Sequence, residues 1–324
     1  MLSKAGHFIE RRVPAALIMP IATALMFGVF SVFQPKIFAI ANIVNVFNQS
    51  SYLALFAAAQ SVVILTRGFD LSLGTAVSTV SVVTALVMTR MGNGDLAIPL
   101  GCAAGLGAAV LVGLFNGLTI TVLNINPFVV TLATFNILLT VSSTISGGFP
   151  VSGLPQEFSA ILGSGSISGF PIVIILTVAI LIGLQVVLDT TVFGRSLYII
   201  GSNPKAARAA GIPVRFHLVG AYIMCSVLIG IGAVLLTART GSGEPNLGGT
   251  LALQTISAAV VGGMSLRGGE GSMLAPVSGA LFVTVLSNGM NLLQVNGYLQ
   301  EVFLGVLVVA ALCLDRLRRS FRSI

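Results

Sequence analysis

Long apolar runs separated by short polar breaks extend from residue 13 to residue 314. A hydrocarbon core about 30 Å thick is crossed by a helix of roughly 20 apolar residues, and a window of about 19 residues locates such helices. The pattern predicts an all-α polytopic bundle that forms one transmembrane domain over residues 1–324. The ten predicted spans are 13–33, 51–66, 71–89, 96–122, 127–146, 171–188, 218–238, 251–265, 272–290 and 298–314.

Two of these spans are near or below the minimum crossing length. The stretch 37–49 mixes apolar residues with asparagines, so we interpret it as an interfacial helix or loop, which leaves 51–66 short. The span 251–265 is short as well, and both spans end in a glycine-containing polar break. Interrupted helices in the two halves of a chain are typical of a transport pathway. Two ordinary tight cytoplasmic turns explain the same pattern equally well.

The composition excludes a water-soluble particle of this size. Hydrophobic residues make up 56% of the chain and charged residues 8%, against about 25% charged in soluble domains. The net charge of +7 comes from Lys and Arg residues that lie between apolar runs, unlike the clustered basic face of a nucleic-acid-binding protein. Cys102, Cys225 and Cys313 stand in apolar stretches without metal-ligand spacing, so they predict neither a disulfide framework nor a metal site.

The distribution of basic residues predicts which way the spans face. Lys and Arg are retained on the cytoplasmic side of short loops. With the N-terminus inside, thirteen of the sixteen basic residues are cytoplasmic, and only Lys36, Arg90 and Arg239 are external. This split requires both termini in the cytoplasm and an even number of spans. The first apolar run has no small-residue cleavage pattern, so we expect it to be a retained helix rather than a signal peptide.

The longest predicted cytoplasmic segment, 189–217, contains the sequence of a short helix. Asn203 can cap the first free N–H groups, Pro204 suits the first helical position, and Gly211 can adopt the left-handed conformation that ends a helix. A helix of about two turns is marginal in water on its own. We therefore expect it to pack on another surface.

The side chains of this short helix suit contact with another protein. Lys205 and Arg208 can engage acidic groups at the rim of a contact. Four small side chains would let the backbone approach closely: Ala206, Ala207, Ala209 and Ala210. The alternative is a solvated basic loop that only follows the positive-inside rule.

The polar breaks after the two short spans carry candidate gate residues. Asp70 is expected to cap the next span by accepting the N–H of Ser72 or Leu73, and Arg67 is close enough in sequence to pair with Asp70. Arg267 and Glu270 offer the same arrangement in the second half. The gate and turn residues proposed from these breaks are Gly68, Asp70, Ser72, Gly74, Ser265, Gly268, Gly269 and Gly271.

Uncharged amides within or near the spans suit a neutral, hydroxyl-bearing solute, because each amide can donate and accept a hydrogen bond. The candidate pathway residues are Gln60, Asn116, Asn136, Gln254, Asn288 and Asn291. Hydrogen bonds between helices are the alternative role for each. Glu301 is the one acidic residue inside a predicted span, which disfavours a carboxylate proton relay. The spacing Gly101-x-x-x-Gly105 and Gly113-x-x-x-Gly117 predicts close helix packing.

Enzymatic chemistry has little support in the sequence. His7 and His217 both lie outside the predicted spans, and no HExxH sequence occurs, so neither a nucleophile paired with a histidine base nor a zinc protease is indicated. A phosphate-binding P-loop needs Gly-Lys before Ser or Thr, and none of the three lysines follows a glycine. We expect no catalytic residue, metal or resident cofactor in this chain.

Four stretches, in this order and spacing, resemble the permease subunits of bacterial ABC importers, in the branch that carries ribose and other monosaccharides and is related to branched-chain amino-acid permeases. They are 68–74, similar to Gly-Gly-x-Asp-Leu-Ser-x-Gly; 116–132, with Asn116-Gly117 and Asn126-Pro127-Phe128; 201–212; and 262–292. Together they cover the chain from about residue 50 to residue 314. One difference is Arg67, which stands where the family usually has its first glycine.

The resemblance implies a bacterial inner-membrane complex with three kinds of partner. These are a second permease chain, identical or a sister subunit, two cytoplasmic ATPases that bind ATP and Mg, and an external sugar-binding protein facing the outer loop 147–170. The residues that the resemblance places at the ATPase are Gly201, Asn203, Pro204, Lys205, Ala206, Ala207, Arg208, Gly211 and Ile212. A stand-alone secondary carrier or channel for a small polar solute is the alternative function.

Overall fold

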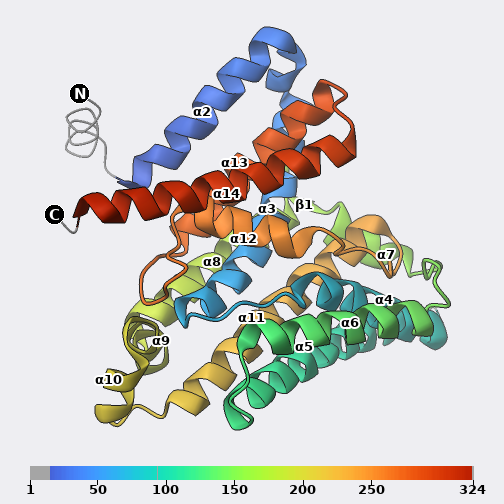
Figure 1. Ribbon diagram of the computed structural model, residues 1–324. Coiled ribbons are helices and arrows are strands. Elements are labelled where there is room, and N and C mark those ends of the chain that lie inside the picture. Colours follow the sequence, from blue (N-terminus) through green and yellow to red (C-terminus); the bar gives the residue numbers. More distant parts are fainter. Residues whose placement is uncertain (1–14, 93, 323–324) are drawn as a thin grey trace.

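The computed structural model describes residues 15–92 and 94–322, which fold into a helical bundle (Figure 1). The longer helices are α2 (Ala15–Phe33), α3 (Ile40–Leu65), α4 (Leu73–Met91), α5 (Ala97–Val122), α6 (Pro127–Ile145), α8 (Ile172–Thr190), α9 (Val192–Ser202), α11 (Val214–Thr240), α12 (Leu251–Gly262), α13 (Leu274–Leu292) and α14 (Gly297–Arg322). The short elements are the 3₁₀ turn η1 (Pro35–Phe38), α7 (Gln156–Phe158), the π-helical turn η2 (Ser159–Gly163), the antiparallel pair β1 (Ser166–Ile167) and β2 (Phe170–Pro171), and α10 (Pro204–Ala209).

Three helices form the centre of the bundle. Every residue of α3 from Ser50 to Leu65 is buried, and most of α4 and α11 is buried as well. The outer helices α5, α6 and α8 bury one face and expose large apolar side chains on the other, such as Leu111 and Ile182. In a protein that crosses a membrane, this exposed apolar surface is in contact with lipid. Helices α3, α4 and α11 therefore form the core of the bundle, and α5, α6 and α8 lie between this core and the lipid.

The sequence prediction was wrong about the start of α3. The stretch 37–49 is not a separate interfacial segment, because η1 ends at Phe38 and α3 continues without a break from Ile40 to Leu65. Its 26 residues make a helix about 39 Å long. The asparagines in the first part of α3 led to the wrong prediction. One of them, Asn42, exchanges two amide hydrogen bonds of 3.0 and 2.9 Å with Asn288 of α13.

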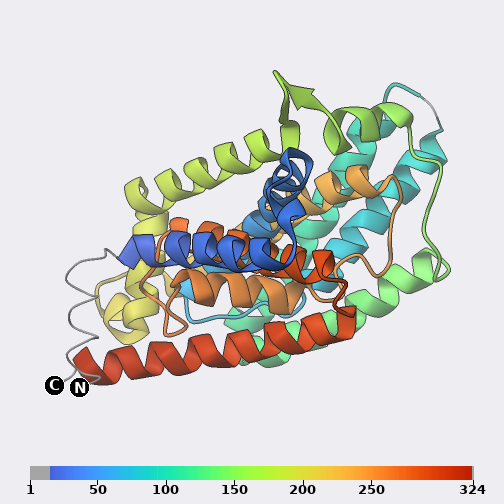
Figure 2. The same ribbon diagram turned by 90° about the horizontal axis from the view of Figure 1, so that it is seen from above.

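Each predicted span corresponds to one helix of the structure, but these helices differ in length. Among the described residues, α4, α5, α6, α8 and α11 have the length and composition to cross a membrane. The predicted short span 251–265 is the 12-residue helix α12, which is only about 18 Å long. The beginning of α2 and the end of α14 lie at the same end of the bundle as α9 and α10 (Figures 1 and 2). The number of spans and the side of the termini stay predictions.

Glycines of α5 explain how three long helices pack tightly. A methyl group at Gly105 would lie 2.1 Å from the Oγ1 atom of Thr84 in α4, and one at Gly113 would lie 2.7 Å from the backbone oxygen of Tyr222 in α11. A methyl group at Gly101 would lie 2.3 Å from the Met88 side chain in α4, and one at Gly117 would lie 3.0 Å from the Cα atom of Val219 in α11. The two predicted glycine pairs therefore serve helix packing, one pair against each neighbour.

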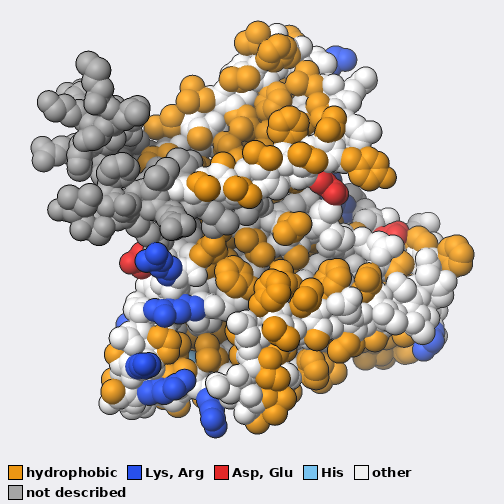
Figure 3. Space-filling view, viewed as in Figure 1, with side chains coloured by type: hydrophobic (Ala, Val, Ile, Leu, Met, Phe, Trp, Pro, Cys, Tyr) orange, Lys and Arg blue, Asp and Glu red, His pale blue; other side chains and the backbone are white. Residues whose placement is uncertain are grey.

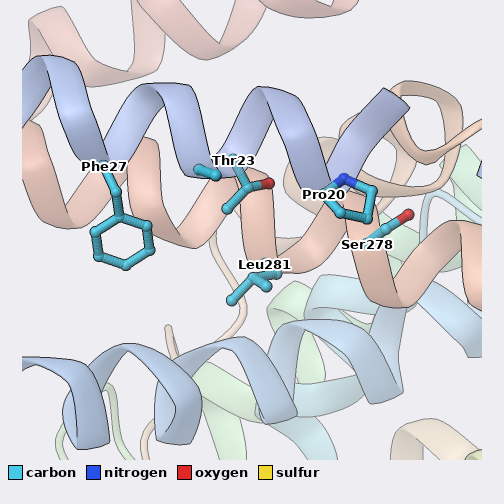
Figure 4. Close-up of a pocket in the computed structure, with 6 residues that line it drawn as sticks. Pro20, Thr23, Phe27, Ser278 and Leu281 are labelled. Atoms are coloured by element: carbon cyan, nitrogen blue, oxygen red, sulfur yellow. The ribbon is translucent and has the colours of Figure 1, made fainter. Parts of the chain in front are cut away.

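Helix α2 packs on α13, where Phe30 lies against Gly289. A cavity of about 230 Å³ lies between α2 and α13, and Figure 4 shows Phe27, Thr23 and Leu281 along it. Pro20 lies inside α2, where it removes a backbone hydrogen bond. The Oγ1 atom of Thr23 donates to the Met19 carbonyl at 2.9 Å.

Candidate functional site

The short helix α10 has the ends that the sequence predicts. The side chain of Asn203 accepts hydrogen bonds from the N–H groups of Lys205 and Ala206, both at 3.1 Å, and Pro204 is the first helical residue. Gly211 adopts a φ of +79°, and the Ile212 N–H donates back to the Ala207 carbonyl at 3.0 Å. These contacts satisfy free backbone N–H and carbonyl groups at both ends of α10. Residues within and next to α10 therefore determine where it begins and ends.

One face of α10 packs on its own chain. The side chain of Ala207 is completely buried in a small cluster with Ile200 of α9 and Val214 of α11. Ala207 therefore anchors α10 on its own chain, and the part of this segment in coupling to a partner stays a prediction. The residues of α10 and its C-terminal cap that remain exposed are Lys205, Ala206, Arg208, Ala209 and Ala210.

Helix α9 connects α10 to the helical bundle. The Oγ1 atom of Thr191 caps α9 by accepting the Gly194 N–H at 3.0 Å. Near the other end, the Tyr198 hydroxyl donates to the Gly271 carbonyl at 2.9 Å. Burial, together with the nearby Asp189 carboxylate, raises the pKa of Tyr198 above its ordinary value of 10, so this hydroxyl stays a neutral donor. The hydrogen bond from Tyr198 to Gly271 joins α9 to the glycine-rich segment 267–271, which follows α12.

The C-terminal end of α9 meets both polar breaks at a contact that we call the inner junction, formed by Leu65, Arg67, Gly201, Ser202 and Gly269. The Arg67 side chain donates through Nε to the Gly201 carbonyl and through Nη2 to the Ser202 carbonyl. The Gly269 N–H donates to the Leu65 carbonyl at 2.8 Å. The inner junction therefore brings together two segments about 200 residues apart in sequence, directly before α10.

Close backbone contact at the inner junction requires glycine. A methyl group on Gly201 would lie 1.8 Å from the Leu65 oxygen and 2.4 Å from the Gly269 nitrogen. Gly268 and Gly269 also have φ values of +72° and +75°, which L side chains rarely adopt. Two of the glycines proposed from the sequence as gate and turn residues, Gly268 and Gly269, thus lie in one contact with Gly201 of the predicted coupling segment.

The predicted pairing of Arg67 with Asp70 is wrong. The Arg67 guanidinium binds the end of α9, and the Asp70 carboxylate is completely buried. Its Oδ1 atom accepts hydrogen bonds from the Ser72 N–H at 2.9 Å and from the Ser72 hydroxyl at 2.5 Å. Asp70 therefore does accept the predicted N–H, although Ser72 occupies the capping position of α4. The Oδ2 atom of Asp70 has no hydrogen-bond partner among the described residues.

Asp70 belongs to a buried network that ties four helices together. The Asn116 amide of α5 donates to the Ser72 hydroxyl at 3.0 Å and accepts from the Thr134 hydroxyl of α6 at 2.6 Å. The Gln60 amide of α3, with its nitrogen turned to the Asp70 carbonyl, makes contacts of 3.2 Å with both backbone groups of Asp70. Buried polar groups are costly unless they are bonded, so this network fixes one position for the segment between α3 and α4.

Two side chains hold the same segment from other directions. The hydroxyl groups of Tyr222 in α11 and Thr131 in α6 lie 3.3 and 3.4 Å from the Phe69 carbonyl, to which both donate. A methyl group on Gly68 would approach the Tyr222 oxygen to 2.7 Å. The sequence analysis missed Tyr222 and Thr134, because a tyrosine or threonine in an apolar helix looks like an ordinary core residue.

The remaining gate and turn residues lie close to these contacts. A methyl group on Gly74, in the first turn of α4, would meet the Gly248 oxygen at 2.2 Å. Ser265 is buried after α12, and its carbonyl accepts the Gly268 N–H at 3.0 Å. Gly271 has a φ of +137°, and a methyl group there would meet the sulfur of Met264 at 2.4 Å. Gly74 and Gly271 therefore leave no room for a side chain.

The candidate pathway amides divide into two groups. Gln60, Asn116 and Asn288 are buried and hydrogen-bonded between helices, while their contact with a solute stays a prediction. Asn136 and Asn291 are exposed. Gln254 is partly exposed, and its amide donates to the Thr250 hydroxyl at 3.1 Å. This second group is therefore at least partly exposed.

The connection between α6 and α8 lies at the opposite end of the bundle from α10 (Figure 1). Val151 and Gly243 exchange two backbone hydrogen bonds of 2.9 Å, which attach this connection to the end of α11. Several of its large side chains are exposed, among them Phe149, Ile161 and Phe170. An exposed apolar surface of this kind is typical of an interaction site.

Comparisons with known proteins agree with this arrangement. Residues 42–312 match the family described as "Branched-chain amino acid transport system / permease component". Similar proteins include the ribose import permease protein RbsC of Bacillus subtilis, 35% identical over 89% of this chain and 88% of that protein. The galactose/methyl galactoside import permease protein MglC of Escherichia coli is 33% identical, over 89% of this chain and 90% of its own length.

A further relative is the D-allose transport system permease protein AlsC of Escherichia coli, 32% identical over 91% of this chain and 89% of that protein. No solved structure matches the chain. The relatives are named as permeases, and the long apolar helices of this chain fit insertion as a multi-pass inner-membrane protein. The chain belongs to the family of branched-chain amino acid transport system permease components.

Proposed function

We propose that this chain is the membrane-embedded permease subunit of an ATP-binding-cassette importer that carries a monosaccharide into a bacterial cell. The observation that carries the proposal is α10, a self-capped helix with one face anchored through Ala207 and a basic face exposed at the end of the bundle. The names of the relatives, which refer to galactose, D-allose and ribose, support a sugar as the substrate.

The partner ATPase supplies the energy in this proposal. It binds ATP and Mg, and it docks on the exposed face of α10 through contacts with Lys205, Ala206 and Ala209. Because α10 is a closed two-turn unit packed on α9, it moves with α9 when the ATPases close. The inner junction then passes this displacement to Arg67 and Leu65 at the start of the break between α3 and α4.

The pathway forms where a second permease chain faces this one. The exposed amides Asn136 and Asn291 and the partly exposed Gln254 are the candidates that would hydrogen-bond sugar hydroxyls there. On the outer side, the connection between α6 and α8 with its exposed Phe149 and Phe170 receives the external sugar-binding protein. The chain itself contributes conformational change and no bond chemistry.

Reconstitution into proteoliposomes tests this function. The full-length chain is combined with the ATPase and the sugar-binding protein encoded beside it, with ATP inside the vesicles and radiolabelled ribose, galactose or allose outside. We expect sugar uptake only when all components and hydrolysable ATP are present. Uptake by the chain alone, driven by an ion or sugar gradient, would instead establish the stand-alone carrier.

A further inference from the structure

A groove opens where α5, α6, α10 and α11 meet, at the same end of the bundle as the coupling helix. Its volume is about 1140 Å³. It is lined by Ile120, Thr121, Asn124, Ile125, Asn126, Pro127, Arg208, Pro213, Val214, Arg215, Phe216 and Leu218. Since α5 ends and α6 and α11 begin here, the groove lies at the ends of three helices that are long and apolar enough to cross a membrane.

One wall of the groove is apolar and continues onto the outer surface of α5. Ile125 and Leu218 line it, and Phe216 beside them is 71% exposed. The neighbouring Val122 and Leu123 at the end of α5 are each 63% exposed. These side chains form an apolar surface that leads from the outer face of α5 into the groove beside the polar Asn124 and Asn126, and a lipid chain can lie along it.

The other part of the groove is positively charged. Arg208 and Arg215 both line it, and none of its twelve lining residues is acidic. Lys and Arg side chains gather on this end of the molecule, over the region of α9 and α10 (Figure 3). A guanidinium group matches the geometry of a phosphate, with which it forms paired charge-assisted hydrogen bonds. Basic pockets between membrane helices on the cytoplasmic side are suited to lipid headgroups.

The groove and the proposed ATPase surface occupy different sides of α10. Of the exposed residues of α10, only Arg208 lines the groove, whereas Lys205, Ala206 and Ala209 do not. An apolar wall continuous with the lipid-facing side of α5 is also a poor match for a water-soluble protein. These two observations favour lipid over a segment of the ATPase as the occupant.

We propose that this groove binds one anionic phospholipid of the inner leaflet, with its phosphate between Arg208 and Arg215 and an acyl chain against Ile125, Phe216 and Leu218. The placement in the inner leaflet rests on the cytoplasmic position of α10 in the proposed function. Bound there, the lipid fills the space between α10 and the end of α5. The anionic lipid content of the membrane would then affect how firmly α10 is held.

The test uses the full-length chain in nanodiscs of phosphatidylcholine, with or without phosphatidylglycerol, and no ATPase. Native mass spectrometry measures retained lipid, and the melting temperature measures stabilisation. We expect phosphatidylglycerol to be retained and to raise the melting temperature. Arg215→Gln, at an exposed position, should weaken retention by about fivefold. Lys205→Gln removes the same charge outside the groove and should retain lipid like the unaltered chain.

Four outcomes would overturn the proposal. Equal loss of lipid in Arg215→Gln and Lys205→Gln would mean general surface charge rather than a groove. If inorganic phosphate alone raised the melting temperature as much as phosphatidylglycerol does, the apolar wall would not contribute to binding. If Ile125→Gln retained as much phosphatidylglycerol as the unaltered chain, the apolar wall would again not contribute to binding. Displacement of the retained lipid by added ATPase would assign the groove to the protein partner. None of these readouts requires transport, so they remain decisive if the proposed sugar import is wrong.

Discussion

The Arg67 side chain donates a hydrogen bond to the Gly201 carbonyl, although 134 positions separate the two residues in the chain. The same guanidinium also binds the carbonyl of Ser202, the last residue of α9. Arg67 itself has a φ of +67°, a left-handed conformation that is uncommon for residues other than glycine. A side chain at a position better suited to glycine therefore connects the break after α3 with the segment that carries α10.

Replacing Arg67 with glycine should uncouple ATP hydrolysis from transport. Glycine adopts the left-handed backbone readily, so the change removes two charge-assisted hydrogen bonds, each worth about 1.5–3 kcal/mol, without straining the turn. We expect the variant to insert normally and to bind the ATPase, while sugar uptake per ATP hydrolysed falls. The measurement is the ratio of the two rates in proteoliposomes.

Gln294→Gly is the matched control for Arg67→Gly. Gln294 also has a positive φ, of +59°, but it follows α13, outside the inner junction. This control should keep the ratio of the unaltered chain. If Arg67→Gly keeps that ratio too, the guanidinium has no part in coupling.

Adding one methyl group at Gly201 should destabilise the protein. The new carbon would lie 1.8 Å from the Leu65 oxygen, a distance that only movement of the backbone can relieve. Overpacking of this kind costs about 1–3 kcal/mol, so the melting temperature of Gly201→Ala should fall. Gly183→Ala in α8, where no atom lies within 4 Å of the added carbon, should melt no lower than the unaltered chain. Equal melting temperatures for both variants would show that the inner junction is loosely packed.

Removing the Asn116 amide should weaken the buried network. Asn116→Leu has a similar volume but leaves the Ser72 and Thr134 hydroxyls without their shared partner, at a cost of about 1–3 kcal/mol. The control Asn136→Leu lies at an exposed position where the amide bonds only its own helix. Unfolding in detergent, combined with Thr134→Val in a double-mutant cycle, measures the effect. Additive losses would show that Asn116 and Thr134 are not coupled.

A charge on the exposed face of α10 should prevent ATPase binding without unfolding the permease. Ala209→Glu places a carboxylate on the surface, and copurification with the ATPase should be lost while the melting temperature is retained. Ala207→Glu would bury the carboxylate beside Ile200 and Val214, so we expect it to lower the melting temperature. If Ala209→Glu still copurifies with the ATPase, the docking surface lies elsewhere on the chain.

The parts of the site that sequence reasoning predicted correctly depend on local chemistry. The ends of α10 follow from Asn203, Pro204 and Gly211, whose roles involve only neighbours a few residues away. The same holds for the hydrogen bond that Asp70 accepts from the Ser72 N–H. The glycine pairs of α5 predicted close packing, although not which helix each pair contacts.

The incorrect predictions concern contacts between distant residues. Arg67 has an acidic neighbour three positions away, but the fold offers it two backbone carbonyls at the end of α9 instead. The asparagines at the start of α3 indicated an exposed segment, because nothing near them in sequence shows that Asn288 pairs with Asn42. A polar residue within a membrane helix can therefore be assigned a role only when its partner is known.

The direct contact between Gly201 and Leu65 leaves no space for a side chain or a water molecule between α9 and the end of α3. The Gly269 N–H bonds the same Leu65 oxygen, so one carbonyl holds the early and late halves of the sequence together. We therefore expect a shift of α9 to displace the segments that follow α3 and α12 together. In the importer that we propose, this shared contact would let both halves of one chain respond together to the ATPase.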